Sequence, residues 1–96
     1  MTLIDALGNG TRLAILRELS REPMYVSELA EKIGMDGKTA VHHLSTLEEN
    51  GLVDHYRRGN RKYYELTRRI ELRIAPTPER TFVLQADPLD DDQDER

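Results

Sequence analysis

The sequence predicts an α+β fold in which short helices come first and β-hairpins follow. Up to about residue 50, apolar residues recur at three- and four-residue steps, and after Gly51 they alternate with a period of about two. Glycines stand where those patterns change, as they do at helix ends and tight turns. With 96 residues and no cysteine, the chain is expected to form one small domain held by a modest apolar core.

Two helices are expected before residue 35. Residues 1–7 can form a short leading helix or a packing arm, which Gly8-Asn9-Gly10 ends. Residues 11–20 form an amphipathic helix that stops before Pro23, because proline disfavours helical geometry in the residue before it. Residues 24–26 could form a short strand. Ser27 is expected to cap a second helix that ends at Gly34.

The third helix is predicted between Asp36 as its N-cap and Gly51 as its left-handed closing residue. Its short separation from the preceding helix is the spacing of a helix-turn-helix. The core side is expected to carry Ala40, Val41, Leu44 and Leu47. The other side carries Lys38, Thr39, His42, Ser45 and Thr46. These hydrogen-bonding groups suit base edges in a DNA major groove, although an ordinary surface helix remains the alternative.

A β-hairpin is predicted from residues 52–58 and 61–66, joined by the two-residue turn Gly59-Asn60. This register places Val53 opposite Leu66, His55 opposite Tyr64, and Tyr56 opposite Tyr63. Four cations then gather at the tip: Arg57, Arg58, Arg61 and Lys62. A hairpin with a basic tip after such a helix predicts the wing of a winged helix-turn-helix, with phosphate or minor-groove contact favoured over a merely solvated hairpin.

A β extension is predicted at the C-terminal end of the domain, which we place at residues 1–85. Its strands begin at about residue 69, with Ile70, Leu72 and Ile74 in the first and residues 81–85 in the second. Residues 86–96 hold six of the 18 acidic residues but only one of the 14 basic ones, so we expect a disordered acidic tail. Such a tail either competes for the basic wing or keeps the protein soluble.

The net charge of −4 conceals a basic stripe. Between Arg57 and Arg73 there are seven basic residues and two acidic ones, and a local stripe matters more for phosphate contacts than the average does. No apolar run is long enough to span a bilayer, and no signal-peptide pattern opens the chain. We therefore expect no membrane partner and a cytoplasmic location.

Four stretches together resemble the ArsR-type winged helix-turn-helix transcriptional regulators. They are residues 6–16, 27–34, 39–53 and 57–66, and they span about two-thirds of the chain in the order and spacing of that family. The resemblance implies a homodimer that binds a near-palindromic operator, with the third stretch in the major groove.

The chain departs from the usual pattern of that family in several features and matches it at one histidine. Val41 and His42 stand where the family usually has a Ser-Arg pair, so an arginine that could read guanine is missing. His43 matches the family histidine and is expected to pack partly inward. Family members that sense soft metals use cysteines, which this chain lacks, and many dimerise through a C-terminal helix where this chain predicts strands.

The predicted function is sequence-specific binding of double-stranded DNA by a homodimer, with no cofactor, no metal and no catalytic residue. The alternative is a winged-helix module that binds protein. The dimer would use Leu3, Ile4 and Leu7, with or without the strands around residues 70–74. A histidine-based metal or acid–base site, from His42, His43 or His55 with Glu48, Glu49 or Asp54, is not expected, since no compact triad is evident. The predicted DNA-binding residues are Lys38, Thr39, Val41, His42, Ser45, Arg57, Arg58, Arg61 and Lys62.

Overall fold

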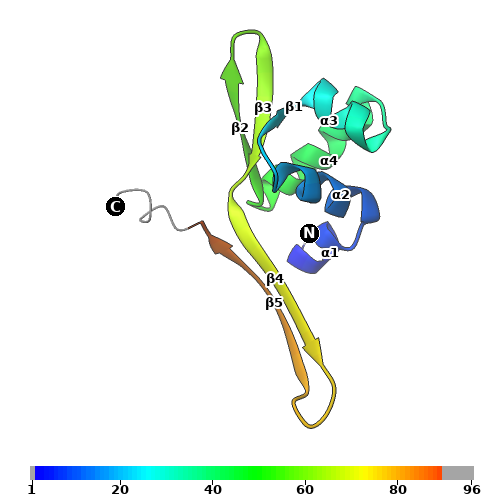
Figure 1. Ribbon diagram of the computed structural model, residues 1–96, viewed down its shortest axis with the longest axis vertical. Coiled ribbons are helices and arrows are strands. Elements are labelled where there is room, and N and C mark those ends of the chain that lie inside the picture. Colours follow the sequence, from blue (N-terminus) through cyan, green and yellow to red (C-terminus); the bar gives the residue numbers. More distant parts are fainter. Residues whose placement is uncertain (1, 90–96) are drawn as a thin grey trace. The chain divides into compact units, whose positions relative to one another are not determined.

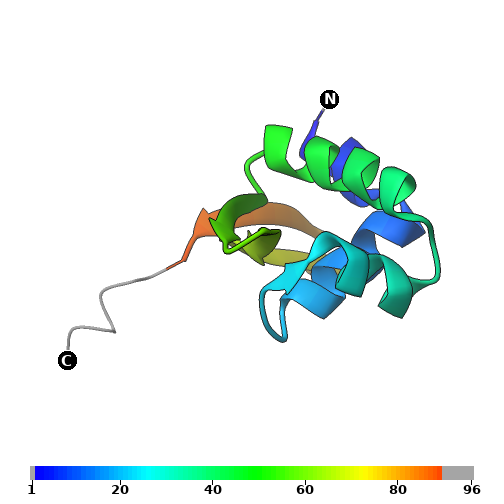
Figure 2. The same cartoon turned by 90° about the horizontal axis from the view of Figure 1, so that it is seen from above.

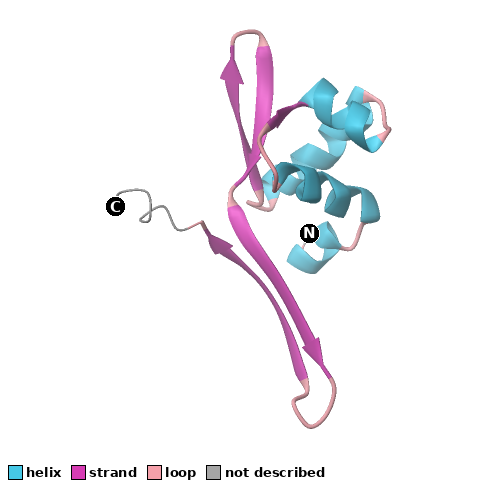
Figure 3. Ribbon diagram, in the orientation of Figure 1, coloured by secondary structure: helices cyan, strands magenta, loops and turns pink. Residues whose placement is uncertain are grey.

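The computed structural model describes residues 2–89, and the chain divides into two compact units, Met1–Leu66 and Thr67–Arg96. The first unit holds α1 (Leu3–Leu7), α2 (Gly10–Leu19), β1 (Met24–Tyr25), α3 (Val26–Ile33), α4 (Gly37–Glu49), β2 (Val53–Arg58) and β3 (Arg61–Leu66) (Figure 1). The second holds β4 (Arg68–Ala75) and β5 (Thr81–Pro88) (Figure 3). Among residues 2–89, no helix combines the length and apolar character needed to cross a membrane.

The ends of α4 form as the sequence predicts. The Asp36 side chain accepts a hydrogen bond of 2.7 Å from the backbone N–H of Thr39, which satisfies one of the unpaired donors of the first turn. Gly51 has a φ of 75°, and the N–H of Leu52 donates to the carbonyl of Leu47 at 3.0 Å. The left-handed Gly51 therefore reverses the chain directly from α4 toward the hairpin.

The start of α3 corrects the prediction that Ser27 is its cap. The N-cap is Tyr25, and it makes no side-chain capping hydrogen bond. Met24 and Tyr25 pair with Tyr64 and Tyr63 of β3. The chain therefore enters α3 directly from a strand, and strand pairing sets the boundary in place of a capping side chain. The predicted end at Gly34 is confirmed, with a φ of 89°.

The three-stranded sheet has the order β1-β3-β2, and its pairs are antiparallel. Val53 pairs with Leu66, His55 with Tyr64, and Tyr56 with Tyr63, which confirms the predicted register. Figures 1 and 2 show the helices of this unit on one side of the sheet and the β2–β3 hairpin extending past them.

The core of the first unit forms between these helices and the base of the sheet. Ala40, Leu44 and Leu47 of α4 are fully buried, as predicted, but Val41 is 41% exposed and Thr46 is buried. The backbone carbonyl of Thr46 accepts a hydrogen bond of 2.8 Å from the Asn50 side-chain amide, where the chain leaves α4. The buried side of α4 is thus rotated toward Thr46 and away from Val41.

The side chain of Arg12, which lies on α2, contacts both α1 and α4. Its Nε donates to the carbonyl of Ala6 at 2.6 Å, and its Nη2 donates to the carbonyl of Asp5 at 3.2 Å. These carbonyls belong to the last turn of α1, where helix geometry leaves acceptors unpaired. Its Nη1 lies 3.4 Å from Nδ1 of His43 on α4. Half-buried His43 therefore packs inward, as the family resemblance implied.

The second unit is a two-stranded antiparallel ribbon. Ile70 pairs with Ala86, Leu72 with Leu84, and Ile74 with Phe82. Strand β5 continues to Pro88, so Ala86, Asp87 and Pro88 belong to it, and the predicted start of the acidic tail at residue 86 is too early. Asp87 pairs in register with Arg69, and its carboxylate accepts a hydrogen bond of 2.8 Å from the side-chain amide of Gln85. Residues 90–96 of the predicted tail lie outside the described residues.

Falling pH is expected to destabilise the first unit through His43. Its pKa lies below the ordinary 6.5, first because burial disfavours the imidazolium and then because Arg12 and His42 add positive charge nearby. The unfolded chain therefore binds more protons, so this stabilisation is complete above about pH 6.5 and is lost as the pH falls below it. Between about pH 7.5 and about pH 5.5, the denaturant midpoint of the wild-type protein should fall more than that of His43→Gln.

The matched control for this measurement is His42→Gln, which removes the exposed neighbouring histidine and leaves His43 in place. The denaturant midpoint of this variant should fall with pH by most of the amount seen in the wild-type protein. An equal fall in the wild-type protein and in His43→Gln would show that His43 is not the residue responsible.

Candidate nucleic-acid interface

The outer side of α4 carries a strip of exposed residues. Lys38, Val41, His42 and Ser45 are spaced by three, four and seven positions, so they share one side of the helix. Thr39 is exposed beside them. All five predicted DNA-binding residues on α4 are therefore exposed to solvent. Thr46, which was predicted on the same side of the helix, is buried. The strip combines one ammonium, two hydroxyls, an imidazole and one apolar side chain.

The tip of the β2–β3 hairpin gathers four cations. Arg57 pairs across the strands with Lys62, and Arg58 pairs with Arg61, next to Gly59, whose φ is 63°. Like charges directly opposite each other in a hairpin are destabilising. Within residues 2–89, no carboxylate lies within 4.0 Å of any of these four cations. Within this part of the chain, the positive charge of the tip therefore has no acidic partner.

Tyrosine rings lie beside two of the tip arginines, Arg58 and Arg61, a feature that is not among the predictions from the sequence. Tyr56 and Tyr63 stack with centroids 5.6 Å apart and planes 5° apart, and Tyr25 meets Tyr63 edge-on at 5.4 Å. The Arg58 guanidinium lies 5.9 Å from the centroids of both Tyr56 and Tyr63. The Arg61 guanidinium lies 4.2 Å from that of Tyr25.

These ring contacts position the guanidinium groups without neutralising their charge. A guanidinium that rests on a ring keeps N–H groups at its edge for anions. One signal was available in the sequence: Tyr56 precedes Arg58 by two residues, and Arg61 precedes Tyr63 by two, so each pair lies on one face of its strand.

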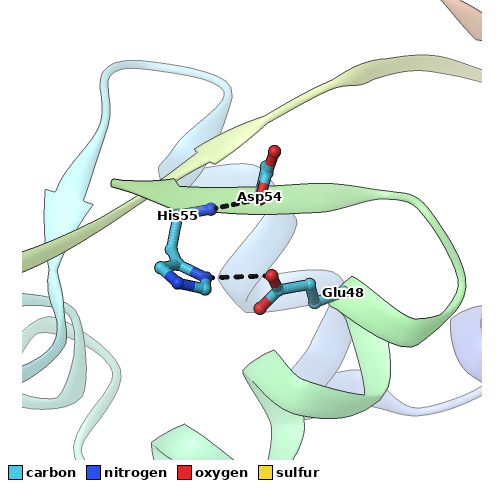
Figure 4. A group of neighbouring side chains, drawn as sticks. All are labelled: Glu48, Asp54 and His55. Carbon is cyan, nitrogen blue, oxygen red and sulfur yellow. Dashed lines mark hydrogen bonds and ion pairs between the residues drawn. The ribbon is translucent and has the colours of Figure 1, made fainter. Parts of the chain in front are cut away.

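A second polar group lies where α4 meets the hairpin (Figure 4). His55 Nδ1 is 2.9 Å from Glu48 Oε2, and the Asp54 carboxylate accepts a 2.8 Å hydrogen bond from the backbone N–H of His55. From the sequence, no compact triad is expected among these residues, His42 and His43. The structure brings Glu48, Asp54 and His55 together and leaves the other two histidines out.

The predicted residues thus form two exposed patches in the first unit. One is the outer strip of α4 and the other is the tip of the hairpin, where only Lys62 is half-buried. A helix of this kind fits a major groove, and a basic hairpin fits the phosphates or the minor groove beside it. The arrangement suits an extended polyanion better than a small molecule.

Comparison with known proteins points to the same architecture. A sequence model of a helix-turn-helix domain matches residues 7–56. The HTH-type transcriptional regulator NmtR of Mycobacterium tuberculosis is 40% identical over 63 residues, which cover 66% of this chain and 52% of NmtR. The HTH-type transcriptional regulator Rv0324 of the same organism is 41% identical over 61 residues, which cover 64% of this chain and 27% of Rv0324.

A solved structure from Mycobacterium bovis is similar as well. It is the homodimeric winged helix-turn-helix DNA-binding domain of Mb0332, a possible ArsR-family transcriptional regulator. It matches with a TM-score of 0.63 and 40% identity, over 65% of this chain and 57% of that one. This chain spans less than two-thirds of the length of each of these relatives.

Proposed function

This chain belongs to the helix-turn-helix domain family, in the ArsR-type winged form that its sequence predicted, and from that premise we propose that it regulates transcription by binding operator DNA. The observation that carries the proposal is the pairing of two patches on one winged helix. A strip of short hydrogen-bonding residues covers the outside of α4, and four cations without carboxylate partners among residues 2–89 form the wing tip.

In this proposal the two patches contact different parts of the DNA. Residues on α4 enter the major groove, where Lys38, His42 and Ser45 meet base edges with their donors and acceptors. The wing arginines contact phosphates or the minor groove, which adds affinity with little sequence preference. His42 offers a single ring edge where an arginine could bind guanine with two hydrogen bonds, so discrimination at that base pair is weaker than an arginine would give.

The rival function is a winged-helix module that binds another protein. Val41 on α4 and Leu13 on α2 are 41% and 51% exposed, and exposed apolar side chains can serve protein docking. The uncompensated wing charge favours DNA over this rival. The proposed role is binding and not catalysis. A chain that binds operator DNA works where the chromosome lies, so a cytoplasmic location is part of the same proposal.

We further propose that the protein is a homodimer joined through its β ribbon. The sequence predicts Leu3, Ile4 and Leu7 as the first part of the interface. Leu7 is buried within the first unit, and Ile4 is 51% exposed. The ribbon has one apolar face, made of Ile70, Leu72, Ile74, Phe82, Leu84 and Ala86. Three of these side chains, Leu72, Ile74 and Phe82, are between 56% and 65% exposed.

A second copy of the chain is the occupant that this face fits best. A two-stranded hairpin alone is marginally stable in water and needs an apolar partner surface. A two-fold dimer provides such a surface without any other protein, because the apolar face of one copy packs against the same face of the other. The similar Mb0332 domain is itself described as homodimeric.

The wing prediction concerns salt dependence. The triple variant Arg57→Ala, Arg58→Ala, Arg61→Ala should weaken DNA binding and flatten the plot of log K against log salt by roughly one unit per lost phosphate contact. A matched control replaces three other exposed arginines, Arg17, Arg21 and Arg80, with alanine and should keep the wild-type slope. Fluorescence anisotropy across salt concentrations measures both. An unchanged slope in the wing variant would show that the wing arginines do not contact DNA phosphates.

The recognition-helix prediction concerns sequence preference. His42→Ala or Ser45→Ala should cost about 1–3 kcal/mol on the preferred operator, because each loses a contact to a base edge, and should scarcely change binding to unrelated DNA. Glu49→Ala, at an exposed position near the end of the same helix, is the control. Equal losses on both DNAs would mean that these side chains touch only the backbone. Wild-type protein that binds no DNA would favour the protein-docking rival.

The dimer prediction compares the two faces of the ribbon. Replacing Ile74 and Phe82 with glutamate should convert a dimer to a monomer in sedimentation velocity, because it places charges inside an apolar interface. Replacing Arg73 and Val83, the adjacent pair on the opposite face, with glutamate should leave the dimer intact. Both variants should keep the wild-type helical circular dichroism, since all four helices lie in the first unit. A wild-type monomer at micromolar concentration would contradict this interface.

A further inference from the structure

Glu48, Asp54 and His55 form a compact group of potential metal ligands in the first unit (Figure 4). Each offers one donor atom, and the three donor atoms lie within 4.8 Å of one another. Glu48 lies in the last turn of α4, and Asp54 and His55 lie near the start of β2. The group therefore spans the junction between the helix and the hairpin.

Two local features bring these donors together. Gly51 reverses the chain after α4, so that β2 passes back beside the end of the helix. Neighbouring residues in a strand point to opposite faces, which would separate Asp54 from His55. The hydrogen bond from the His55 N–H to Asp54 Oδ1 holds that carboxylate back toward the histidine.

The orientation of the imidazole is also restrained. The His55 ring lies 5.6 Å from the ring of Tyr64, which is only 1% exposed and so forms a fixed wall. On its other side, Nδ1 points to Glu48 Oε2 at 2.9 Å. The side chains of His55 and Glu48 are 37% and 31% exposed, which leaves room for water ligands and for small rotations.

We propose that Glu48, Asp54 and His55 bind a divalent first-row transition-metal ion, with water completing the coordination shell. One imidazole with two carboxylates is a donor set that suits such ions. Donors bound at about 2.0–2.2 Å to one tetrahedral zinc ion lie about 3.3–3.6 Å apart, so the exposed side chains must rotate to bring the three donors closer together. The ion would lie between His55 Nδ1 and Glu48 Oε2, and an exposed contact of this kind contributes little stability of its own.

Binding at this junction would link the end of α4 to the first strand of the hairpin. An ion that binds the folded protein and not the unfolded chain raises the melting temperature by mass action. This inference does not rest on the proposed DNA binding, because metal binding and melting are measured without DNA.

The test is isothermal titration with Zn²⁺ and with Mn²⁺, alongside thermal unfolding with and without each ion. The wild-type protein should bind one ion per chain at this site and melt at a higher temperature when loaded. Each ligand variant, Glu48→Gln, Asp54→Asn and His55→Gln, should weaken that binding at least tenfold and reduce the shift in melting temperature. Their matched controls, Glu49→Gln and His42→Gln, replace exposed residues of the same types outside the group and should bind within twofold of the wild-type protein.

Three outcomes would overturn the proposal. The wild-type protein could bind neither ion. Binding could persist unchanged in all three ligand variants, in which case carboxylates elsewhere in the chain hold the ion. The control variants could lose binding as strongly as the ligand variants. Circular dichroism at low temperature confirms that each variant is folded, and three independent ligand variants keep the test decisive if one of them fails to fold.

Discussion

Burial of one side of α4 determines which residues of that helix are exposed on the surface of the first unit. Ala40, Leu44 and Leu47 have no exposed surface, and truncating a buried leucine costs roughly 2–5 kcal/mol. Exposed polar contacts are worth about 1 kcal/mol or less, so they cannot rotate the helix against that burial. Successive residues advance by about 100° around a helix, and the same burial therefore turns His42 and Ser45 outward. The outer strip is therefore free of the packing constraints that fix the buried side.

The helix and the hairpin are connected at two places besides the backbone turn. Tyr25 is the N-cap of α3, and its ring also contacts Tyr63 and the Arg61 guanidinium, so the beginning of the helix-turn-helix is joined to the wing. At the far end of α4, Glu48 meets His55 of β2. Together these contacts restrict how the wing can move relative to α4. Any ligand that engages both patches benefits, because less conformational entropy is lost on binding.

Much of the fold could be predicted from the sequence, because many of its features depend on residues a few positions apart. The cap at Asp36, the left-handed Gly34 and Gly51, and the register of the β2–β3 hairpin follow from such local rules. The alternation that predicted the ribbon strands is equally local. The family resemblance rests on segments whose order and spacing are visible in the chain itself. Helical and strand periodicity also predicted most of the exposed positions proposed to contact DNA. It assigned Val41 to the core side of α4 and Thr46 to the outer side, however, and the structure reverses both.

Errors and omissions arose where distant residues meet. Ser27 does not cap α3 because Met24 and Tyr25 pair with β3. Strand β5 continues past Gln85 because Ala86 and Asp87 pair with Ile70 and Arg69 of β4. Arg12 contacts both α1 and α4, which local sequence patterns do not indicate. The sequence by itself determined which segments are helical or extended and which charges cluster along the chain. Only the tertiary structure decided which side chains meet, including His55 with Glu48, because turns and strand pairing set those distances and composition does not.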